Sequence, residues 1–488
     1  MNFAAEVVDA VPPERLALVE LARDGTRREW SFGEVAERSA LLAGSLAARG
    51  VGRGDVVMTV IGNRPEWVFA MLACFRIGAV VLPCTEQLRP KDLALRIAQA
   101  GPSLILADER NLSQLADAGV PVLAIPDEEL YRAAPAAAVE LDESEPCLIT
   151  FTSGTAGEPK GVLHAQRYLH GQRLQAERWL APAPGELVWC TAASGWSKSA
   201  RNVFIAPWLQ GAAALLHDAR FDPQERLELL ARERVAVLCM APTEYRVIAK
   251  RATLAPLPRL RAMVAAGEAL NPEVLDTWRE ATGLEIRDGY GQTETGQLTG
   301  APRGGETRAG SMGPPLPGVE MAIEDGQLTV APASVPTFFL GYLGEEVVRG
   351  EDGRWRVRDR RAEGTWRTGD RVTRDEDGWL YFEGRGDDVI VSAGYRIGPF
   401  EVESALVAHP AVAEAAAVAA PDEERGAVVR AVVVLRDGHA AGPALAAELQ
   451  EHVKNVTAPY KYPRIVDFAE ELPKTTSGKI KRAELRGG

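Results

Sequence analysis

Strand and helix patterns alternate along much of this sequence, and that alternation restricts its fold more than any other feature. The run DVVMTVIG at 55–62 is typical of a buried strand, after which Asn63 can cap a helix with Pro65 in its first turn. The runs AVVLPC, RPKDLALRIAQAG and PSLILAD continue the alternation, and VAVLCMAP and LRAMVAAGEAL resume it beyond residue 234. Strands separated by helices form parallel sheets that helices cover. We therefore expect an α/β fold.

The pattern changes after about residue 300. GSMGPPLPG is typical of a loop, and the Trp-, Arg- and Gly-rich stretch 328–382 predicts short antiparallel strands. Further on, EVESALVAH and PALAAELQEHVKNV read as helices and AVVRAVVVL reads as a strand. About 100 residues suffice for an independent core. We therefore expect a large domain over 1–384 and a small α+β domain over 385–488.

Composition and charge exclude several classes of protein. The formal net charge of −13 argues against a general nucleic-acid binder, because such proteins meet phosphates with basic faces. The five cysteines are scattered, which argues against a disulfide framework and a zinc site. The N-terminus carries acids where a signal peptide has bases, and no apolar run approaches the roughly 18 residues of a membrane span. We expect a cytoplasmic protein with no nucleic-acid partner and no membrane span.

The stretch TFTSGTAGEPKG at 150–161 has the composition of a phosphate-binding loop. Backbone N–H groups in a glycine-rich turn can hold an anion, and hydroxyl side chains and a lysine add to that site. It is not a Walker A loop, because Pro159 precedes the lysine and Gly161 follows it. The alternative is an exposed turn with a surface lysine. The candidate residues are Thr152, Ser153, Gly154, Thr155 and Lys160.

Two further motifs carry acids. In DGYGQTETG at 288–296, Thr293 and Glu294 present a hydroxyl and a carboxylate, and a carboxylate beside phosphates suits Mg²⁺. In WRTGD, Asp370 can accept hydrogen bonds from ribose hydroxyls. The alternative for both segments is an ordinary turn with an exposed acid.

The last two motifs lie in the small domain. GRGDDVIVSAGYRIGPFEVE at 384–403 contains Arg385, Asp387, Gly394 and Arg396. LPKTTSGKIKR at 472–482 presents Lys479 on a polar, glycine-containing segment. A basic tail of this kind is otherwise a solvated chain end.

In this order the five motifs resemble those of the AMP-forming acyl-CoA synthetases, within the adenylate-forming superfamily that includes luciferases and peptide-synthetase adenylation domains. The resemblance covers nearly the whole chain and is closest to the medium-chain acyl-CoA synthetases. It implies two doubly wound α/β subdomains and a small distorted β-barrel, followed by a mobile α+β C-terminal domain. The N-terminus and the segment EDGQLTVAPASVPTFFL are shorter than is usual in the family.

The resemblance implies a two-step reaction with ATP, Mg²⁺ and coenzyme A. A carboxylate attacks the α-phosphorus of ATP to give an acyl-adenylate and pyrophosphate, and the thiol of coenzyme A then displaces AMP. Two anions meet in the first step, so fixed positive charge and oriented donors are required.

The resemblance also assigns residues. Glu294 holds Mg²⁺, Lys479 bridges the substrate carboxylate and the α-phosphate, and Asp387 is the hinge of the mobile domain. Coenzyme A passes Ala393 and Gly394. The residues implied to bind ATP are Thr152, Ser153, Gly154, Thr155, Lys160, Gly267, Glu268, Ala269, Asp288, Gly289, Tyr290, Thr293, Asp370, Arg385 and Arg396.

The acid is predicted by comparison with acetyl-CoA synthetases, which carry a Trp where this chain has Gly291. Loss of an indole leaves room for a medium-chain fatty acid or an aryl acid, and Trp196 is expected to border that site. Lys198 and Arg201 are unexpected beside an apolar pocket. Three roles remain open for them: contact with the coenzyme, recognition of a polar acid, or exposure to solvent.

Several alternatives remain open from the sequence. The acyl group could pass to a carrier-protein phosphopantetheine, the chain could be a luciferase-type monooxygenase, or it could bind nucleotide without turnover. The oligomeric state is open too, a homodimer included. The segment around Lys479 resembles sites that lysine acetyltransferases modify in relatives, which implies such an enzyme as a partner.

Overall fold

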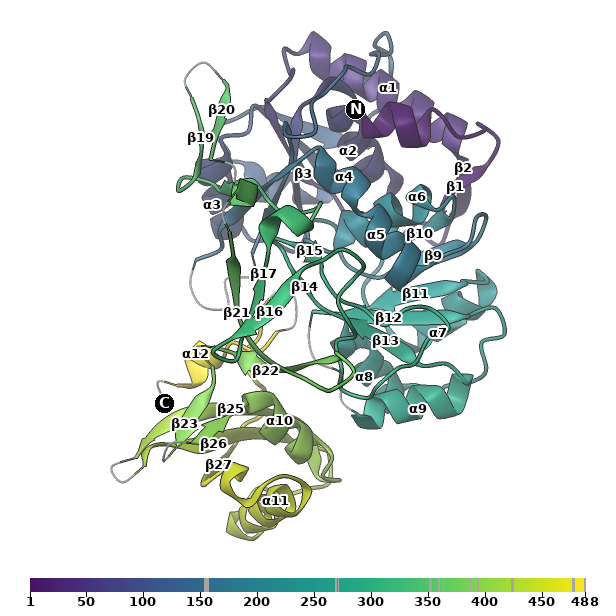
Figure 1. Cartoon of the computed structure of the whole chain (residues 1–488). Helices are drawn as coiled ribbons and strands as arrows, with labels where there is room; N and C mark the ends of the chain where they lie inside the picture. The colour runs from purple at the N-terminus through teal and green to yellow at the C-terminus, as the bar shows by residue number, and fades with distance from the viewer. Residues whose placement is uncertain are drawn as a thin grey trace.

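The computed structural model describes residues 1–152, 158–267, 270, 272–350, 353–358, 360–362, 364–386, 388–392, 395–422, 425–475 and 479–486. A large body holds most of the chain, and a smaller domain at one end carries the C-terminus (Figure 1). The predicted α/β class is confirmed, because parallel strands alternate with helices as far as Gly289.

The first α/β subdomain is built on a sheet that has seven strands among the described residues, in the order β18-β8-β7-β4-β3-β5-β6. Strands β7, β4, β3, β5 and β6 are parallel, whereas β8 and β18 are antiparallel additions. Every residue of β3, β4 and β5 is buried, as expected where helices cover both faces of a sheet. The bounds are β3 (Val56–Val60), β4 (Val80–Cys84), β5 (Leu104–Asp108), β6 (Val122–Ile125), β7 (Pro146–Phe151), β8 (Gly161–Ala165), β18 (Gly341–Tyr342), α1 (Phe32–Ala48), α2 (Pro65–Ile77) and α3 (Pro90–Ala100).

The second subdomain contains a sheet in the order β13-β12-β11-β9-β10-β1-β2. Its strands are parallel except for β2, which forms a hairpin with β1. The bounds are β1 (Leu16–Leu21), β2 (Arg27–Ser31), β9 (Leu187–Cys190), β10 (Ala213–His217), β11 (Val237–Met240), β12 (Ala262–Ala266), β13 (Ile286–Gly289), α4 (Arg167–Gly171), α5 (Arg173–Gln175), α6 (Ala206–Leu209), α7 (Pro223–Arg232), α8 (Pro242–Arg251) and α9 (Pro272–Thr282).

Helix α2 belongs to a hydrophobic core shared by the two subdomains, which includes Phe69 of α2, Val81 of β4 and Val264 of β12. The helix begins with Pro65 and is followed by Gly78, whose φ of 73° is left-handed. The prediction that Asn63 caps this helix is wrong, because Arg64 occupies the cap position and makes no side-chain cap bond.

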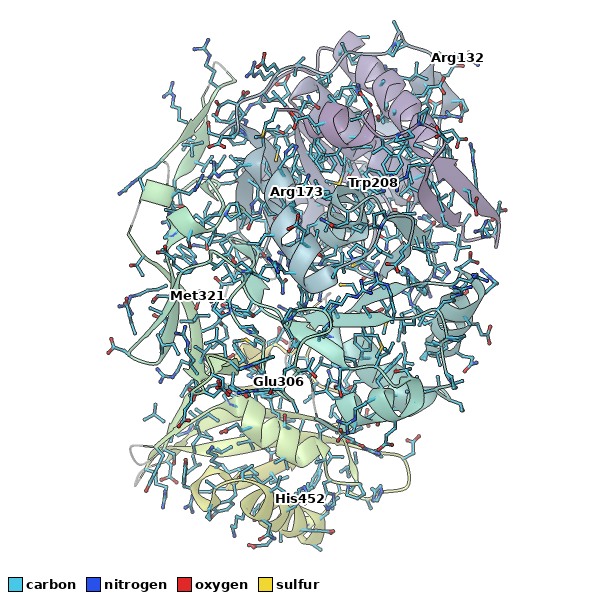
Figure 2. The ribbon with its side chains drawn as sticks, turned by 45° about the vertical axis from the view of Figure 1, so that its right-hand side comes forward. Arg132, Arg173, Trp208, Glu306, Met321 and His452 are labelled. Carbon is cyan, nitrogen blue, oxygen red and sulfur yellow. The ribbon has the colours of Figure 1, made fainter. Side chains whose placement is uncertain are left out.

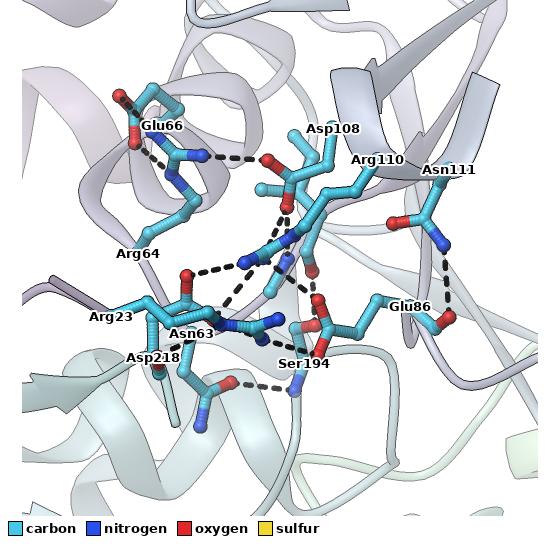
Figure 3. Close-up of polar contacts among 12 residues, drawn as sticks. Arg23, Asn63, Arg64, Glu66, Glu86, Asp108, Arg110, Asn111, Ser194 and Asp218 are labelled. Atoms are coloured by element: carbon cyan, nitrogen blue, oxygen red, sulfur yellow. Dashed lines mark hydrogen bonds and ion pairs between the residues drawn. The ribbon is translucent and has the colours of Figure 1, made fainter. Parts of the chain in front are cut away.

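Asn63 instead fixes a loop of the second subdomain. Its Nδ2 donates to the carbonyl of Ala192 at 3.1 Å, and its Oδ1 accepts from the backbone N–H of Ser194 at 2.7 Å. Figure 3 shows the contact with Ser194. Gly195, with φ of 88°, packs so closely that an added Cβ would lie 2.5 Å from the backbone nitrogen of Thr85. Loop 191–200 is therefore held against the first sheet.

A network of charged side chains joins the carboxyl ends of the two sheets (Figure 3). Asp108, fully buried at the end of β5, lies 2.6 Å from Arg64 and 2.8 Å from Arg110. Arg110 also contacts Asp218, which follows β10, at 2.9 Å. A buried carboxylate requires such compensation. The sheet edges that carry the motifs are therefore held in a fixed relation.

An antiparallel part follows the two subdomains, as predicted. In the ranges described, it forms a four-stranded sheet in the order β16-β17-β21-β22, together with two short hairpins. The bounds are β14 (Gly291–Gln292), β15 (Gly296–Gln297), β16 (Met321–Glu324), β17 (Gln327–Val330), β19 (Val347–Arg349), β20 (Trp355–Val357), β21 (Trp366–Arg374) and β22 (Leu380–Arg385).

The C-terminal domain has its own core, in which Val402, Val433 and Leu449 are buried together. His452 marks this domain in Figure 2, whereas Trp208 lies inside the large body and donates its indole N–H to the carbonyl of Ala17.

Among the residues that the structure describes, none of the helices has the length and apolar character needed to cross a bilayer. The bounds are β23 (Ile390–Ser392), β24 (Tyr395–Ile397), β25 (Val412–Asp422), β26 (Gly426–Leu435), β27 (Ile465–Phe468), α10 (Pro399–Val407), α11 (Pro443–Val456) and α12 (Arg482–Leu485).

Candidate active site

Asp370 is the centre of a buried polar cluster. It lies on β21, where its carboxylate accepts hydrogen bonds from the hydroxyl of Tyr290 and, at 2.9 Å, from Nε2 of Gln292. Arg385 faces it across the β21–β22 pairing, with Nε 3.5 Å from Oδ1. Burial raises the pKa of the Asp370 carboxyl, while Tyr290, Arg385, Gln292 and Lys479 oppose that rise. A carboxylate fixed in this way can accept bonds from a pair of ligand hydroxyls.

Tyr290 reaches this cluster from the carboxyl end of the second sheet. Ala266 of β12 pairs with Gly289 of β13, so Gly267 and Tyr290 both follow directly after paired strand ends. An added Cβ at Gly289 would lie 2.8 Å from the backbone carbonyl oxygen of Thr299, which accounts for glycine there. Ligands of open α/β sheets bind outside the carboxyl ends of the strands. Gly267, Asp288, Gly289 and Tyr290 are therefore brought together where a nucleotide base can bind.

Glu294 and Lys160 are brought near one another by Tyr342. The Tyr342 hydroxyl donates to Oε1 of Glu294 at 2.7 Å, and the ring centroid lies 4.9 Å from Nζ of Lys160. Burial and the neighbouring Glu294 raise the pKa of Tyr342, so its hydroxyl stays protonated and donates. Lys160 also pairs with Glu345 at 2.7 Å. Thr293 and Glu294 lie in the turn between β14 and β15.

The first loop is closed at its base. The backbone N–H of Lys160 donates to Oγ1 of Thr152 at 3.0 Å, and the N–H of Thr152 donates to the carbonyl of Lys160 at 3.0 Å. Several predicted site residues lie outside the described part of the chain. These are Ser153, Gly154, Thr155, Glu268, Ala269, Asp387, Ala393, Gly394 and the side chain of Arg396.

Lys479 comes to the cluster from the C-terminal domain. Its backbone is tied to Thr475, because the Lys479 N–H donates to Oγ1 of Thr475 at 3.1 Å and the Lys479 carbonyl accepts from the N–H of Thr475 at 2.8 Å. The positive charge of Lys479 acts to lower the pKa of Asp370. The charge of one small-domain cation is therefore felt at a carboxylate of the large domain, more weakly than that of Arg385.

The residues predicted around the acyl site have different environments. An added Cβ at Gly291 would lie 1.9 Å from the carbonyl oxygen of Gly296, so the approach of β15 alone accounts for this glycine. Trp196 is half-buried and lies in loop 191–200. Arg201 is buried, which excludes exposure to solvent. The ammonium of Lys198 donates to the carbonyl of Ala266 at 2.8 Å.

Two polar residues of this site were not predicted from the sequence. Gln292 lies inside the DGYGQTETG motif, which is a signal that could have identified it. Tyr342 lies in FFLGYLG, outside every motif, and its role depends on β18 pairing with β8.

Glu294 is the carboxylate that the sequence predicts as an Mg²⁺ ligand, and its Oε1 accepts from Tyr342. Within the described ranges, no three His, Cys, Asp or Glu side chains are grouped closely enough to hold a metal by themselves.

Fold and site together define an adenylate-forming enzyme. The model of the AMP-binding enzyme family matches residues 5–352, and the model of its C-terminal domain matches residues 401–479. The chain belongs to this family, and within it to the AMP-forming acyl-CoA synthetases. It is a ligase that joins a carboxylic acid to coenzyme A through an acyl-AMP at the expense of ATP.

Three similar proteins illustrate this membership. The acyl–CoA ligase YtcI of Bacillus subtilis is 37% identical over 97% of this chain and 93% of its own length. Acyl-coenzyme A synthetase ACSM3 of Rattus norvegicus is 38% identical over 99% of this chain and 90% of its own. The anthranilate CoA ligase AuaEII, solved with anthranoyl-AMP, is 26% identical with a TM-score of 0.88, over 100% of this chain and 97% of that one.

Proposed function

We propose that this synthetase activates a medium-chain fatty acid or an aryl acid, with Lys479 supplying the positive charge on which adenylation depends. The proposal rests on Lys479, whose charge acts on the buried carboxylate of Asp370 from the C-terminal domain, as a smaller influence than Tyr290 or Arg385. The carboxylic acid and ATP are both anions, so a cation fixed beside them lowers the barrier to their encounter.

Each of the other site residues has a role in this step. Asp370 accepts the ribose hydroxyls of ATP, and Arg385 stands beside it. Gly267, Asp288 and Tyr290 hold the adenine, and the Thr293 hydroxyl donates to the α-phosphate. The first loop, closed by Thr152 and Lys160, surrounds the β- and γ-phosphates. Glu294 would hold Mg²⁺, which when bound offsets phosphate charge.

The second step uses another face of the C-terminal domain. Rotation at Asp387 would withdraw Lys479 and bring Ala393 and Gly394 to the passage for coenzyme A, where a glycine leaves room for the thiol. Arg396 would reach phosphate in one of the two poses.

The class of acid is supported by one relative and by general energetics. AuaEII was solved with anthranoyl-AMP, an aryl acyl-adenylate, and it shares the fold along the whole chain. Each buried methylene of a longer acid contributes about 0.8 kcal/mol, which favours medium chains over acetate. We assign Trp196 to the border of this acyl site, whereas the close approach of β15 accounts for Gly291 without a role in acyl selection.

The proposal is tested by Lys479→Ala. Loss of a preorganised charge should lower acid-dependent exchange between labelled pyrophosphate and ATP by about 10²–10³-fold. Thioester formation from supplied acyl-AMP and coenzyme A should persist, because the second step uses the other pose. Equal losses in both half-reactions would contradict this division of roles.

Lys474 offers a matched control five residues away. It is exposed and pairs with Glu414 at 2.6 Å within the C-terminal domain, so Lys474→Ala should leave both half-reactions near wild type.

Acetylation of Lys479 by a lysine acetyltransferase would remove the same charge and reproduce the Lys479→Ala loss. We also propose a cytoplasmic location, and a homodimer remains one candidate assembly.

A further inference from the structure

A small pocket lies beside the proposed nucleotide site, at the carboxyl ends of β9, β11 and β12. Its volume is about 20 Å³. Ala266, which forms part of its wall, directly precedes Gly267 of the adenine site. The pocket therefore lies in the crevice where open α/β sheets bind their ligands. It is lined by Cys190, Ala192, Lys198, Asn202, Cys239, Met240, Ala241, Glu244 and Ala266.

Asn202 is the unusual residue of this pocket. Its side chain is completely buried, yet neither Oδ1 nor Nδ2 has a hydrogen-bond partner among the described residues. Buried amides are nearly always paired, because an unpaired donor or acceptor loses its bonds to water without replacement. An amide left in this state on a pocket wall is ready to bind a ligand that offers both an acceptor and a donor.

The charged groups of the wall are already engaged. Lys198 donates to the carbonyl of Ala266 at 2.8 Å, with further N–H donors on the same ammonium. The Glu244 carboxylate accepts from the hydroxyl of Thr191 and lies 3.8 Å from Arg226. A second carboxylate on the substrate would face Glu244 and leave Oδ1 of Asn202 unpaired. A neutral group is not repelled by Glu244, and if it carries a donor it can also pair with Oδ1 of Asn202.

We infer that the acid activated by this enzyme carries a hydroxyl group at the end remote from its carboxylate. A hydroxyl donates one hydrogen bond and accepts others, so it can satisfy Oδ1 and Nδ2 of Asn202 together. Lys198 supplies a further donor, and Met240 and Ala192 line the apolar part. The inference rests on the proposed acyl-CoA synthetase activity and specifies its substrate class.

Contacts with the first subdomain hold the loop at this pocket in place, which favours discrimination between acids with and without a distal hydroxyl. Asn63 bonds to Ala192 and Ser194 of loop 191–200, and Gly195 packs against the backbone at the end of β4. A polar group held by rigid elements rejects analogues that lack the matching hydroxyl far more strongly than a flexible one does.

The experiment compares matched acids that differ only in the distal hydroxyl. Pyrophosphate release is measured for wild type with 6-hydroxyhexanoate and hexanoate, and with 4-hydroxybenzoate and benzoate, with acetate and adipate in the same panel. We expect kcat/KM to favour the hydroxy acid of at least one pair by about tenfold or more. Asn202→Leu, similar in volume, should abolish or reverse that preference, mainly through loss on the hydroxy acid.

The variant Asn455→Leu is the matched control, because Asn455 is exposed on α11 in the C-terminal domain. This variant should keep the wild-type ratio of kcat/KM for the hydroxy acid to kcat/KM for the unsubstituted acid. A wild-type preference for the unsubstituted acids, for acetate or for adipate would overturn the inference, as would an unchanged ratio in folded Asn202→Leu. Should that variant fail to fold, the wild-type ratios decide alone. Absence of pyrophosphate release with every acid would instead overturn the proposed function.

Discussion

At the scale of single residues, the burial of Asp370 and its bond with Tyr290 act in opposite directions on the pH response of the site. Burial raises the pKa of Asp370, and the Tyr290 hydroxyl opposes that rise by stabilising the carboxylate. As the pH falls, Asp370 therefore takes up a proton at a higher pH than an ordinary aspartate does. In the proposed site the Asp370 carboxylate accepts both ribose hydroxyls of ATP, and its protonated form would not, so the KM for ATP should increase as the pH falls through this pKa.

Tyr290→Phe tests this dependence. The variant should raise the KM for ATP about tenfold, on the scale of a lost hydrogen bond to a charged group, and should move the acid limb of the pH profile to higher pH. The readout is pyrophosphate exchange over a range of pH and ATP concentration. Tyr245→Phe also removes a buried hydroxyl, one that bonds backbone carbonyls of β11 and β12, and should leave the acid limb unmoved. An unmoved limb in Tyr290→Phe would refute the pH argument.

At the scale of elements, the short strand β18 couples the phosphate loop to the proposed Mg²⁺ ligand. It pairs with β8, and its Tyr342 contacts Glu294 on one side and Lys160 on the other. Tyr342→Phe should lower adenylation about fivefold and raise the Mg²⁺ concentration needed for half-maximal rate, because Glu294 loses a bond that orients it. Magnesium titration of pyrophosphate exchange measures both effects.

Tyr381→Phe is the control for that change, since it removes a hydroxyl bond to Asp375 in the antiparallel sheet. A fall in rate with no change in the Mg²⁺ requirement would argue that Tyr342 supports the fold of β18 rather than Glu294.

The same strand shows what the sequence could and could not predict. Each motif is contiguous, so its chemistry was accessible residue by residue, and the alternation of strands and helices was enough for the α/β class. The role of Tyr342 was not accessible, because it depends on pairing between residues about 180 positions apart. Asn63 was misjudged for a related reason: its local pattern fits a helix cap, but the loop of the second subdomain offers it stronger partners.

At the scale of the whole molecule, two polar contacts between described residues join helices of the second subdomain to the C-terminal domain. Lys250 of α8 donates to the carbonyl of Ala413 on β25 at 2.9 Å, and Arg436 lies 3.9 Å from Glu273 of α9. Under the proposed function this domain rotates between two half-reactions, and exposed polar contacts of this kind would let it leave one pose for the other.

Lys250→Ala should therefore shift the balance between the poses rather than damage the chemistry. Loss of one partly exposed hydrogen bond, worth about 1 kcal/mol, should reduce pyrophosphate exchange about fivefold. Thioester formation from supplied acyl-AMP should be unchanged or faster, because the competing pose loses nothing. Lys454→Ala, which removes contacts with Glu451 and with the Tyr462 ring inside the C-terminal domain, should affect neither half-reaction. Parallel losses in both half-reactions of Lys250→Ala would mean that this contact stabilises the fold and not one pose of the domain.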